Sequence, residues 1–229
     1  MDKYMTKENI EYLDRHVNKV KETMRKAATP YSRNEFISLN DVTFVICDEV
    51  MGHFKILKDL KYEIGINKIF FENKFKRKYD KRLLSVIAHE LLHLYIEEMY
   101  PRNIEYMELN YSSDSSPIFL AYVNWFNYHT DIYIGINNYL DGAYDNQDCF
   151  EIDEIKSFYY FEIKVFHLVK KIKEWVMKLQ KEYDNRLKIY FNHNNEWGSK
   201  VTKRDDKTII ELGMLDIFDD KVSFENLSN

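Results

Sequence analysis

Two histidines four residues apart, His89 and His93, constrain this chain more than any other feature, and Glu90 follows the first of them directly. In an α-helix, residues i and i+4 lie one turn apart on the same face, so both imidazoles can reach a single metal ion at about 2.0–2.1 Å. Glu90 is rotated about 100° from His89, which places its carboxylate beside the ligands rather than among them. That position suits a general base acting on a metal-bound water molecule.

The surroundings of this motif are apolar. Val86, Ile87 and Ala88 precede it, and leucines occupy positions 91, 92 and 94. The spacing H-E-x-x-H is typical of zinc sites. The alternative is an ordinary helix with two hydrogen-bonded histidines and a solvent-exposed glutamate. We favour a zinc site, because helical pattern, spacing and apolar flanks coincide.

The composition favours long helices, with 18 Tyr and 15 Phe against only 6 Gly and 3 Pro. Few chain breakers and many large side chains argue against a turn-rich β-sandwich. A chain of 229 residues can form one large domain or two small ones. Because no linker or internal repeat is evident, we predict a single α+β domain over residues 1–229.

Charge and hydropathy exclude several classes of partner. The net charge of −5 argues against a nucleic-acid binder, whose surface is basic. No stretch approaches 18 uncharged apolar residues, so no membrane span is expected. The N-terminus lacks the apolar core of a signal peptide, which predicts a cytoplasmic location. Cys47 and Cys149 are far apart and in no CxxC pair, so neither a disulfide framework nor a thiolate zinc site is indicated.

Apolar residues that recur at three- and four-residue steps predict four helices. These helices are expected over residues 3–28, from Asp80 to just before Pro101, over Ile118–Leu140 and over Glu151–Tyr183. Ser116 is the expected N-cap of the third helix, with Pro117 at its first position.

Short β-branched or alternating runs predict strands at Asp41–Val50 and Tyr62–Phe71, and a small β element at about residues 187–215. The strand at Tyr62–Phe71 directly precedes the histidine helix. If it were an exposed edge, it could pair with an extended peptide beside the metal. The alternative is an ordinary strand with no such role.

A third metal ligand is expected from a different helix. On the helix Ile118–Leu140, four polar residues fall on one stripe of an otherwise apolar surface, with Gly135 among them: Asn124, Asn127, Asp131 and Asn138. Such a stripe needs polar partners or a metal. Asp131 is therefore our candidate third ligand, with Asn124 and Asn127 orienting ligands or substrate. A hydrogen-bonded network between helices is the alternative, and the two interpretations of Asp131 remain about equal.

Other groups compete for the third position. Glu162 interrupts the apolar stripe of the helix Glu151–Tyr183, and two histidines with a glutamate is a known zinc ligand set. We favour a partly exposed residue or a salt bridge for Glu162. His129 is a further candidate, but it faces the apolar side of its helix and is interpreted as a core histidine. Glu97 and Glu98, one turn past His93, are interpreted as surface or supporting carboxylates.

The helix Leu84–Leu94 resembles the active-site helix of the zincin metallopeptidases. The segment Trp125–Asp131 is similar to the second motif of an uncharacterised group of predicted bacterial metallopeptidases, which carry a Trp and then Asn and Asp four residues apart. In that group the aspartate is a proposed metal ligand, and Asp131 is the matching position. The resemblance implies a zincin-like fold, with long helices packed on a small mixed β-sheet.

Two functional hypotheses follow. The first is a zinc-dependent hydrolase acting on a peptide or protein substrate, in which His89, His93 and Asp131 bind Zn²⁺ and Glu90 is the general base on metal-bound water. Tyr128 would donate to the developing oxyanion. The second is a non-catalytic zincin-like module, with or without metal, that binds other proteins.

Overall fold

The computed structural model describes these residues of the 229-residue chain: 4, 6–28, 42–48, 50–58, 61–72, 79–100, 103–104, 107–108, 112, 114, 116–135, 155, 157–170, 173–174, 202–204 and 207–209. They contain long helices and a small mixed sheet, which confirms the predicted α+β class. The chain divides into two compact units, one formed by Met1–Tyr95 with Trp125–Gly135 and the other by Ile96–Asn124 with Ile136–Asn229. The prediction of a single domain stays a prediction.

The first unit begins with helix α1, Lys7–Ala28, close to the predicted range. Its buried face carries Leu13, Val17, Val20 and Met24 at three- and four-residue steps. Burial of such a stripe stabilises an amphipathic helix more than its intrinsic propensity does. The apolar periodicity of the sequence was therefore a sufficient signal for this helix.

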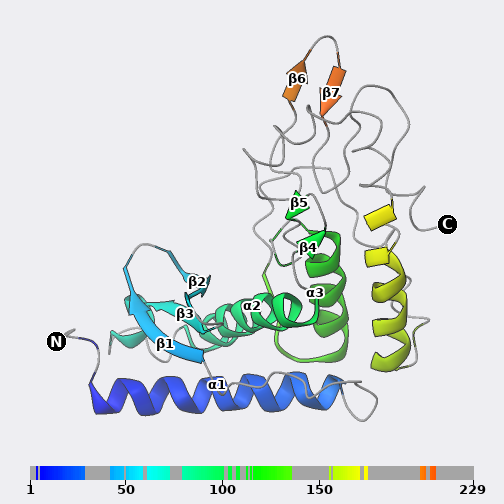
Figure 1. Cartoon of the computed structure of the whole chain (residues 1–229). Coiled ribbons are helices and arrows are strands. Elements are labelled where there is room, and N and C mark those ends of the chain that lie inside the picture. The colour runs from blue at the N-terminus through cyan, green and yellow to red at the C-terminus, as the bar shows by residue number, and fades with distance from the viewer. Residues whose placement is uncertain are drawn as a thin grey trace. The chain divides into compact units, whose positions relative to one another are not determined.

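Three strands form the sheet of the first unit: β1 at Val42–Cys47, β2 at Gly52–Ile56 and β3 at Tyr62–Asn67. Their order is β1-β3-β2, with β1 parallel to β3 and β2 antiparallel to it, as Figure 1 shows. Both β1 and β3 were predicted. The hypothesis that the Tyr62–Phe71 strand is an edge is wrong, because β3 is the central strand and the chain continues after it as the 3₁₀ helix η2, Lys68–Phe71.

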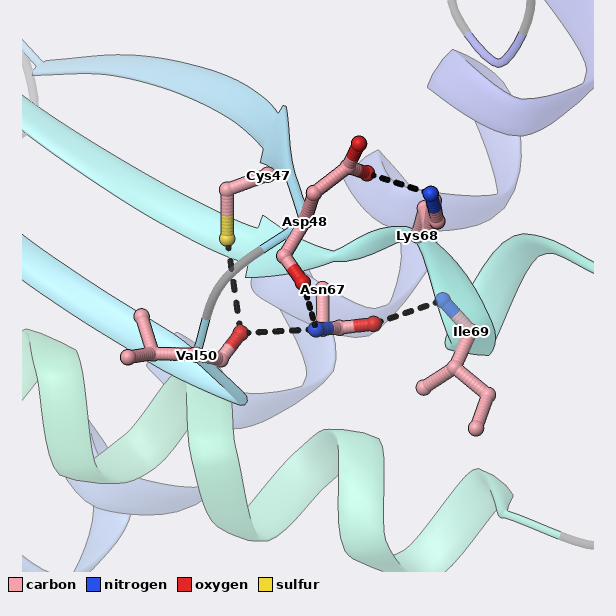
Figure 2. Close-up of polar contacts among 6 residues, drawn as sticks. All are labelled: Cys47, Asp48, Val50, Asn67, Lys68 and Ile69. Carbon is pink, nitrogen blue, oxygen red and sulfur yellow. Dashed lines mark hydrogen bonds and ion pairs between the residues drawn. The ribbon is translucent and has the colours of Figure 1, made fainter.

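The connection between β1 and β2 is held by Asn67, at the end of β3 (Figure 2). The Asn67 side chain donates to the carbonyls of Val50 at 2.9 Å and Asp48 at 3.3 Å, and accepts from the Ile69 amide at 2.9 Å. The Lys68 ammonium lies 2.9 Å from the Asp48 carboxylate. One asparagine thus fixes the path of the chain into β2.

Helix α2, Asp80–Met99, confirms the predicted histidine helix, including its start at Asp80 and its end before Pro101. Its first residue is tied to α1, because Asp80 Oδ1 accepts from the Tyr12 hydroxyl at 3.0 Å and lies 2.7 Å from His16 Nε2. Strand β2 approaches the same helix further along, where Gly52 lies against Val86 and Glu90.

Helix α3, Pro117–His129, starts as predicted, with the Ser116 hydroxyl accepting from the Ile118 amide at 3.2 Å. The predicted extent to Leu140 is wrong, because the helix ends at His129. The Thr130 hydroxyl donates to the Phe126 carbonyl and accepts from the Ile132 amide, which gives the backbone an alternative to the next helical turn.

The second unit contains two short hairpins, β4 (Asn103–Ile104) with β5 (Met107–Glu108), and β6 (Thr202–Arg204) with β7 (Lys207–Ile209). The hairpin β6–β7 confirms a β element within the predicted 187–215 range, although the strand expected at 187–191 lies outside the described residues. Of the helix predicted over Glu151–Tyr183, residues 158–170 and 173–174 are described as helical. None of the helices described has both the length and the apolarity that crossing a membrane requires.

Candidate metal centre

The two histidines of the motif lie side by side on α2. The ring centroids of His89 and His93 are 4.7 Å apart, with an angle of 75° between the ring planes. Both residues are half-buried by their overall exposure. The predicted placement of two imidazoles on one helical face, one turn apart, is confirmed.

A backbone carbonyl sets the orientation of the first ring. His89 Nδ1 lies 3.0 Å from the carbonyl oxygen of Gly135. A carbonyl oxygen can only accept, so Nδ1 carries the proton of this hydrogen bond. In that tautomer the other ring nitrogen, Nε2, carries the lone pair that a metal ligand needs.

The second ring lies against the sheet. The rings of His93 and Phe54, a residue of β2, are stacked with centroids 6.2 Å apart and planes 16° apart. Phe54 stacks in turn on Tyr62 of β3, with centroids 5.7 Å apart. These aromatic contacts limit the rotation of the His93 ring.

Glu90 is a buried carboxylate, with 5% of its surface exposed. It lies where β2 begins, because a Cβ atom added to Gly52 would be only 2.5 Å from Glu90 Oε1. A residue without a side chain therefore makes room for this carboxylate. The apolar flanks of the motif fit this burial, since Ile87, Ala88 and Leu91 are fully buried.

Asp114, which the sequence analysis did not single out, is the third member of a group that includes both histidines. His89, His93 and Asp114 form a group whose ligand atoms all lie within 4.8 Å of one another and that could hold a metal ion. Glu97, one turn after His93 on α2, accepts from the Ser112 hydroxyl at 3.1 Å. That bond ties the loop two residues before Asp114 to the histidine helix.

The chemistry of this group fits zinc. Zn²⁺ is bound by imidazole nitrogens and carboxylate oxygens at about 2.0–2.2 Å, so two ligand atoms of one tetrahedral ion are about 3.3–3.6 Å apart. Separations of up to 4.8 Å in this group are compatible with that spacing. Two imidazoles and one carboxylate would be a donor set of the kind found in catalytic zinc sites.

The other candidate ligands take different places. Asp131 lies beyond the end of α3 and is exposed, so it no longer shares a helical stripe with Asn124 and Asn127. The structure brings Asp114, and not Asp131, into the group with the histidines among the described residues. Of the two interpretations favoured for Glu162, partial exposure is wrong, since only 4% of its surface is exposed, and the salt bridge stays a prediction.

Two aromatic residues of α3 also differ from expectation. His129 is exposed rather than in the core, although its ring lies 3.9 Å from that of Trp125 between centroids. The partial burial of His129 lowers its pKa. Tyr128 is 59% exposed, with its ring against His129, and its role as an oxyanion donor stays a prediction.

Sequence reasoning missed three groups at this site: Asp114, the Gly135 carbonyl and Gly52. The available signal for Asp114 was that it is the one carboxylate in the serine-rich run Ser112–Ser116 before Pro117. The carbonyl of Gly135 has no sequence signal, because every residue carries a backbone carbonyl. Gly52 opens an alternating run, His53 to Ile56, which could have indicated a strand.

Searches of known protein families, of curated proteins and of solved structures found no match to this chain. The site is therefore interpreted from its own geometry.

Proposed function

We propose that this protein is a zinc-dependent hydrolase with a zincin-like fold, and that its substrates are peptides or proteins. One observation carries the proposal: two imidazoles one turn apart, with the buried carboxylate of Glu90 next to the first of them. The bond from His89 Nδ1 to the Gly135 carbonyl supports it, because it leaves Nε2 for the metal.

Zinc, when bound, would supply Lewis acidity, which lowers the pKa of a water molecule and polarises a carbonyl. Glu90 would take a proton from the attacking water and pass it to the leaving amine. Its burial suits that role, because a carboxylate out of bulk water interacts more strongly with the groups near it. His89 and His93 would bind the metal and would not take part in proton transfer.

Strand β2 supports the choice of a peptide substrate. Within the described residues, β2 pairs with β3 on one side, and its other side is an edge of the sheet. The strand carries Gly52 against Glu90 and Phe54 against His93. An extended peptide that added to this edge would run beside the metal group, and its backbone hydrogen bonds would supply affinity for many sequences.

The test is hydrolysis of a broad peptide library by zinc-loaded protein and by its Glu90→Gln variant. We expect Glu90→Gln to lower the rate by about 100-fold or more while zinc content is unchanged, because removal of a general base typically costs that much. Glu98→Gln is a matched control, since Glu98 is an exposed glutamate on the same helix. Stoichiometric zinc with no hydrolysis by the wild type would reject the enzyme and support a non-catalytic, metal-stabilised module.

A further inference from the structure

The backbone amide and carbonyl of Gly135 form hydrogen bonds with two residues of α2 that are one turn apart. The Gly135 amide donates to the Ser85 hydroxyl at 3.3 Å, and its carbonyl accepts from His89 Nδ1 at 3.0 Å. Ser85 and His89 are related by i and i+4, so both point from the same face of the helix. Gly135 is thus docked along that face by both its donor and its acceptor.

The residue before Gly135 is held by the side chain of Asn127. The Ile134 amide donates to Asn127 Oδ1 at 2.6 Å, and Asn127 Nδ2 donates to the Ile134 carbonyl at 3.1 Å. One side-chain amide therefore satisfies both backbone groups of Ile134, as a neighbouring strand would. The Ile134 side chain is fully buried, which fixes the segment from its other side.

We infer that Asn127 is a positioning residue for His89: through Ile134 it fixes the Gly135 carbonyl, which selects the His89 tautomer that offers Nε2 to a metal. The inference rests on the proposed metal-binding function and goes beyond it, since it assigns a role to a residue on a different helix. Groups of this kind, which hold a ligand histidine through its second nitrogen, typically contribute about 10- to 100-fold to metal affinity.

The geometry explains why an asparagine is needed. The position must accept from the Ile134 N–H and donate to the Ile134 C=O at once, and of the common side chains only an amide carries both groups in this arrangement. Aspartate would keep the acceptor and lose the donor. Alanine would lose both, and the segment Thr130–Gly135 would then be held mainly by its buried isoleucines and by Thr130.

The first readout needs no metal. In the metal-free protein, at a pH where the ring is neutral, ¹⁵N NMR distinguishes the two tautomers of His89. We expect the Nδ1–H tautomer in the wild type and a mixture of both tautomers in Asn127→Ala. Asn9→Ala is the matched control, because Asn9 is also a helical asparagine that donates to a backbone carbonyl, that of Tyr4 at 2.8 Å, but it lies on α1.

The second readout is zinc affinity, measured by competition with a chelator. We expect Asn127→Ala to weaken zinc binding about 10- to 100-fold and Asn9→Ala to leave it unchanged. If Asn127→Ala does not fold, Asn127→Asp is used in its place, and we expect it to shift the tautomer and to weaken zinc binding in the same direction. The inference would be overturned if a folded Asn127 variant kept the His89 tautomer of the wild type. If the wild type bound no zinc, but substitution of Asn127 still shifted the tautomer, only the metal function would be overturned.

Discussion

Close contact between β2 and α2 depends on the absence of a side chain at position 52. A Cβ atom there would lie 2.5 Å from Glu90 Oε1, 2.6 Å from Val86 Cγ1 and 3.1 Å from Glu90 Cδ. Carbon atoms pack favourably at about 3.5–4.0 Å, so one of these groups would have to move. Because Glu90 is buried, the movement would take its carboxylate away from its present place against Gly52.

We therefore expect Gly52→Ala to destabilise the protein by about 1–3 kcal/mol, the usual cost of overpacking, and to lower peptide hydrolysis while the zinc content stays at the wild-type level. Urea unfolding and metal analysis measure the two effects. Gly135→Ala is the matched control for stability, since a Cβ atom there would come no closer than 3.9 Å to Ser85 Oγ. Equal stability of the two alanine variants would contradict the account of Gly52.

At the scale of elements, the ends of strands and helices place the groups of the site. Asn67 at the end of β3 fixes the connection from β1 into β2 (Figure 2), and Thr130 directs the chain from the end of α3 back toward α2. In both places a polar side chain replaces the hydrogen bonds that the regular element would have made.

Substituting Asn67 by alanine is expected to cost about 1–3 kcal/mol, because the carbonyls of Asp48 and Val50 and the amide of Ile69 lose their side-chain partner. Lys68→Ala is the adjacent control. Its ion pair with Asp48 is exposed, so its loss should lower the stability less than the Asn67 substitution does. Chemical denaturation of both variants measures the difference, and a larger effect at Lys68 would be inconsistent with this description of the loop.

The link between α1 and α2 predicts a dependence on pH. Burial alone would raise the pKa of Asp80, but the hydrogen bond and charge of His16 outweigh it, and the pKa lies below its ordinary value. A carboxyl group with a depressed pKa stabilises the folded state fully above its unfolded-state pKa of about 3.9, and this stabilisation is lost as the pH falls through the folded-state value.

Asp80→Asn should therefore lower the midpoint of urea unfolding near neutral pH, by an amount that stays constant down to about pH 5 and shrinks below about pH 4. Because the Asp80 side chain is half-exposed, the effect should be modest, about 1 kcal/mol. Glu22→Gln, which removes only the exposed pair with Lys26, should change the midpoint little at any pH. A difference between Asp80→Asn and wild type that grows in acid would rule out this role.

The end of α3 bears on which aspartate is tested as a third ligand. Since the helix stops at His129, Asp131 leaves the stripe that made it a candidate, whereas among the described residues the group that could hold a metal ion contains Asp114. We expect Asp114→Asn to weaken zinc binding by at least about 10-fold and Asp131→Asn to have little effect. Chelator competition separates the two, and the opposite order would restore Asp131.

Across the whole chain, the sequence predicted those elements whose burial follows a simple period. The stripe of α1, the apolar run of β1 and the histidine helix α2 were all found this way. Strand β2 was missed because it is short and starts with a glycine, and α3 was drawn too long because Ile132 and Ile134 continue the apolar pattern. Local patterns cannot report a side-chain bond such as that of Thr130, which ended the helix.

The residues of the candidate site also fall into a predictable and an unpredictable set. The positions of His89, His93 and Glu90 follow from helical geometry, which a sequence determines locally. Asp114, of the group that could hold a metal ion, and the Gly135 carbonyl, which is bonded to His89, lie outside the helices, where the course of the chain depends on tertiary contacts. No periodicity in the sequence could have identified them.

The most direct test of the central claim is metal analysis of the purified, zinc-reconstituted protein together with X-ray absorption at the zinc edge, for the wild type and His93→Ala. The account predicts one zinc ion per chain with two imidazole ligands in the wild type, and loss of the ion in the variant, because a single imidazole of the pair cannot hold it at the same affinity. A wild type that binds no zinc, or a His93→Ala variant with unchanged zinc content and an unchanged absorption spectrum, would contradict it.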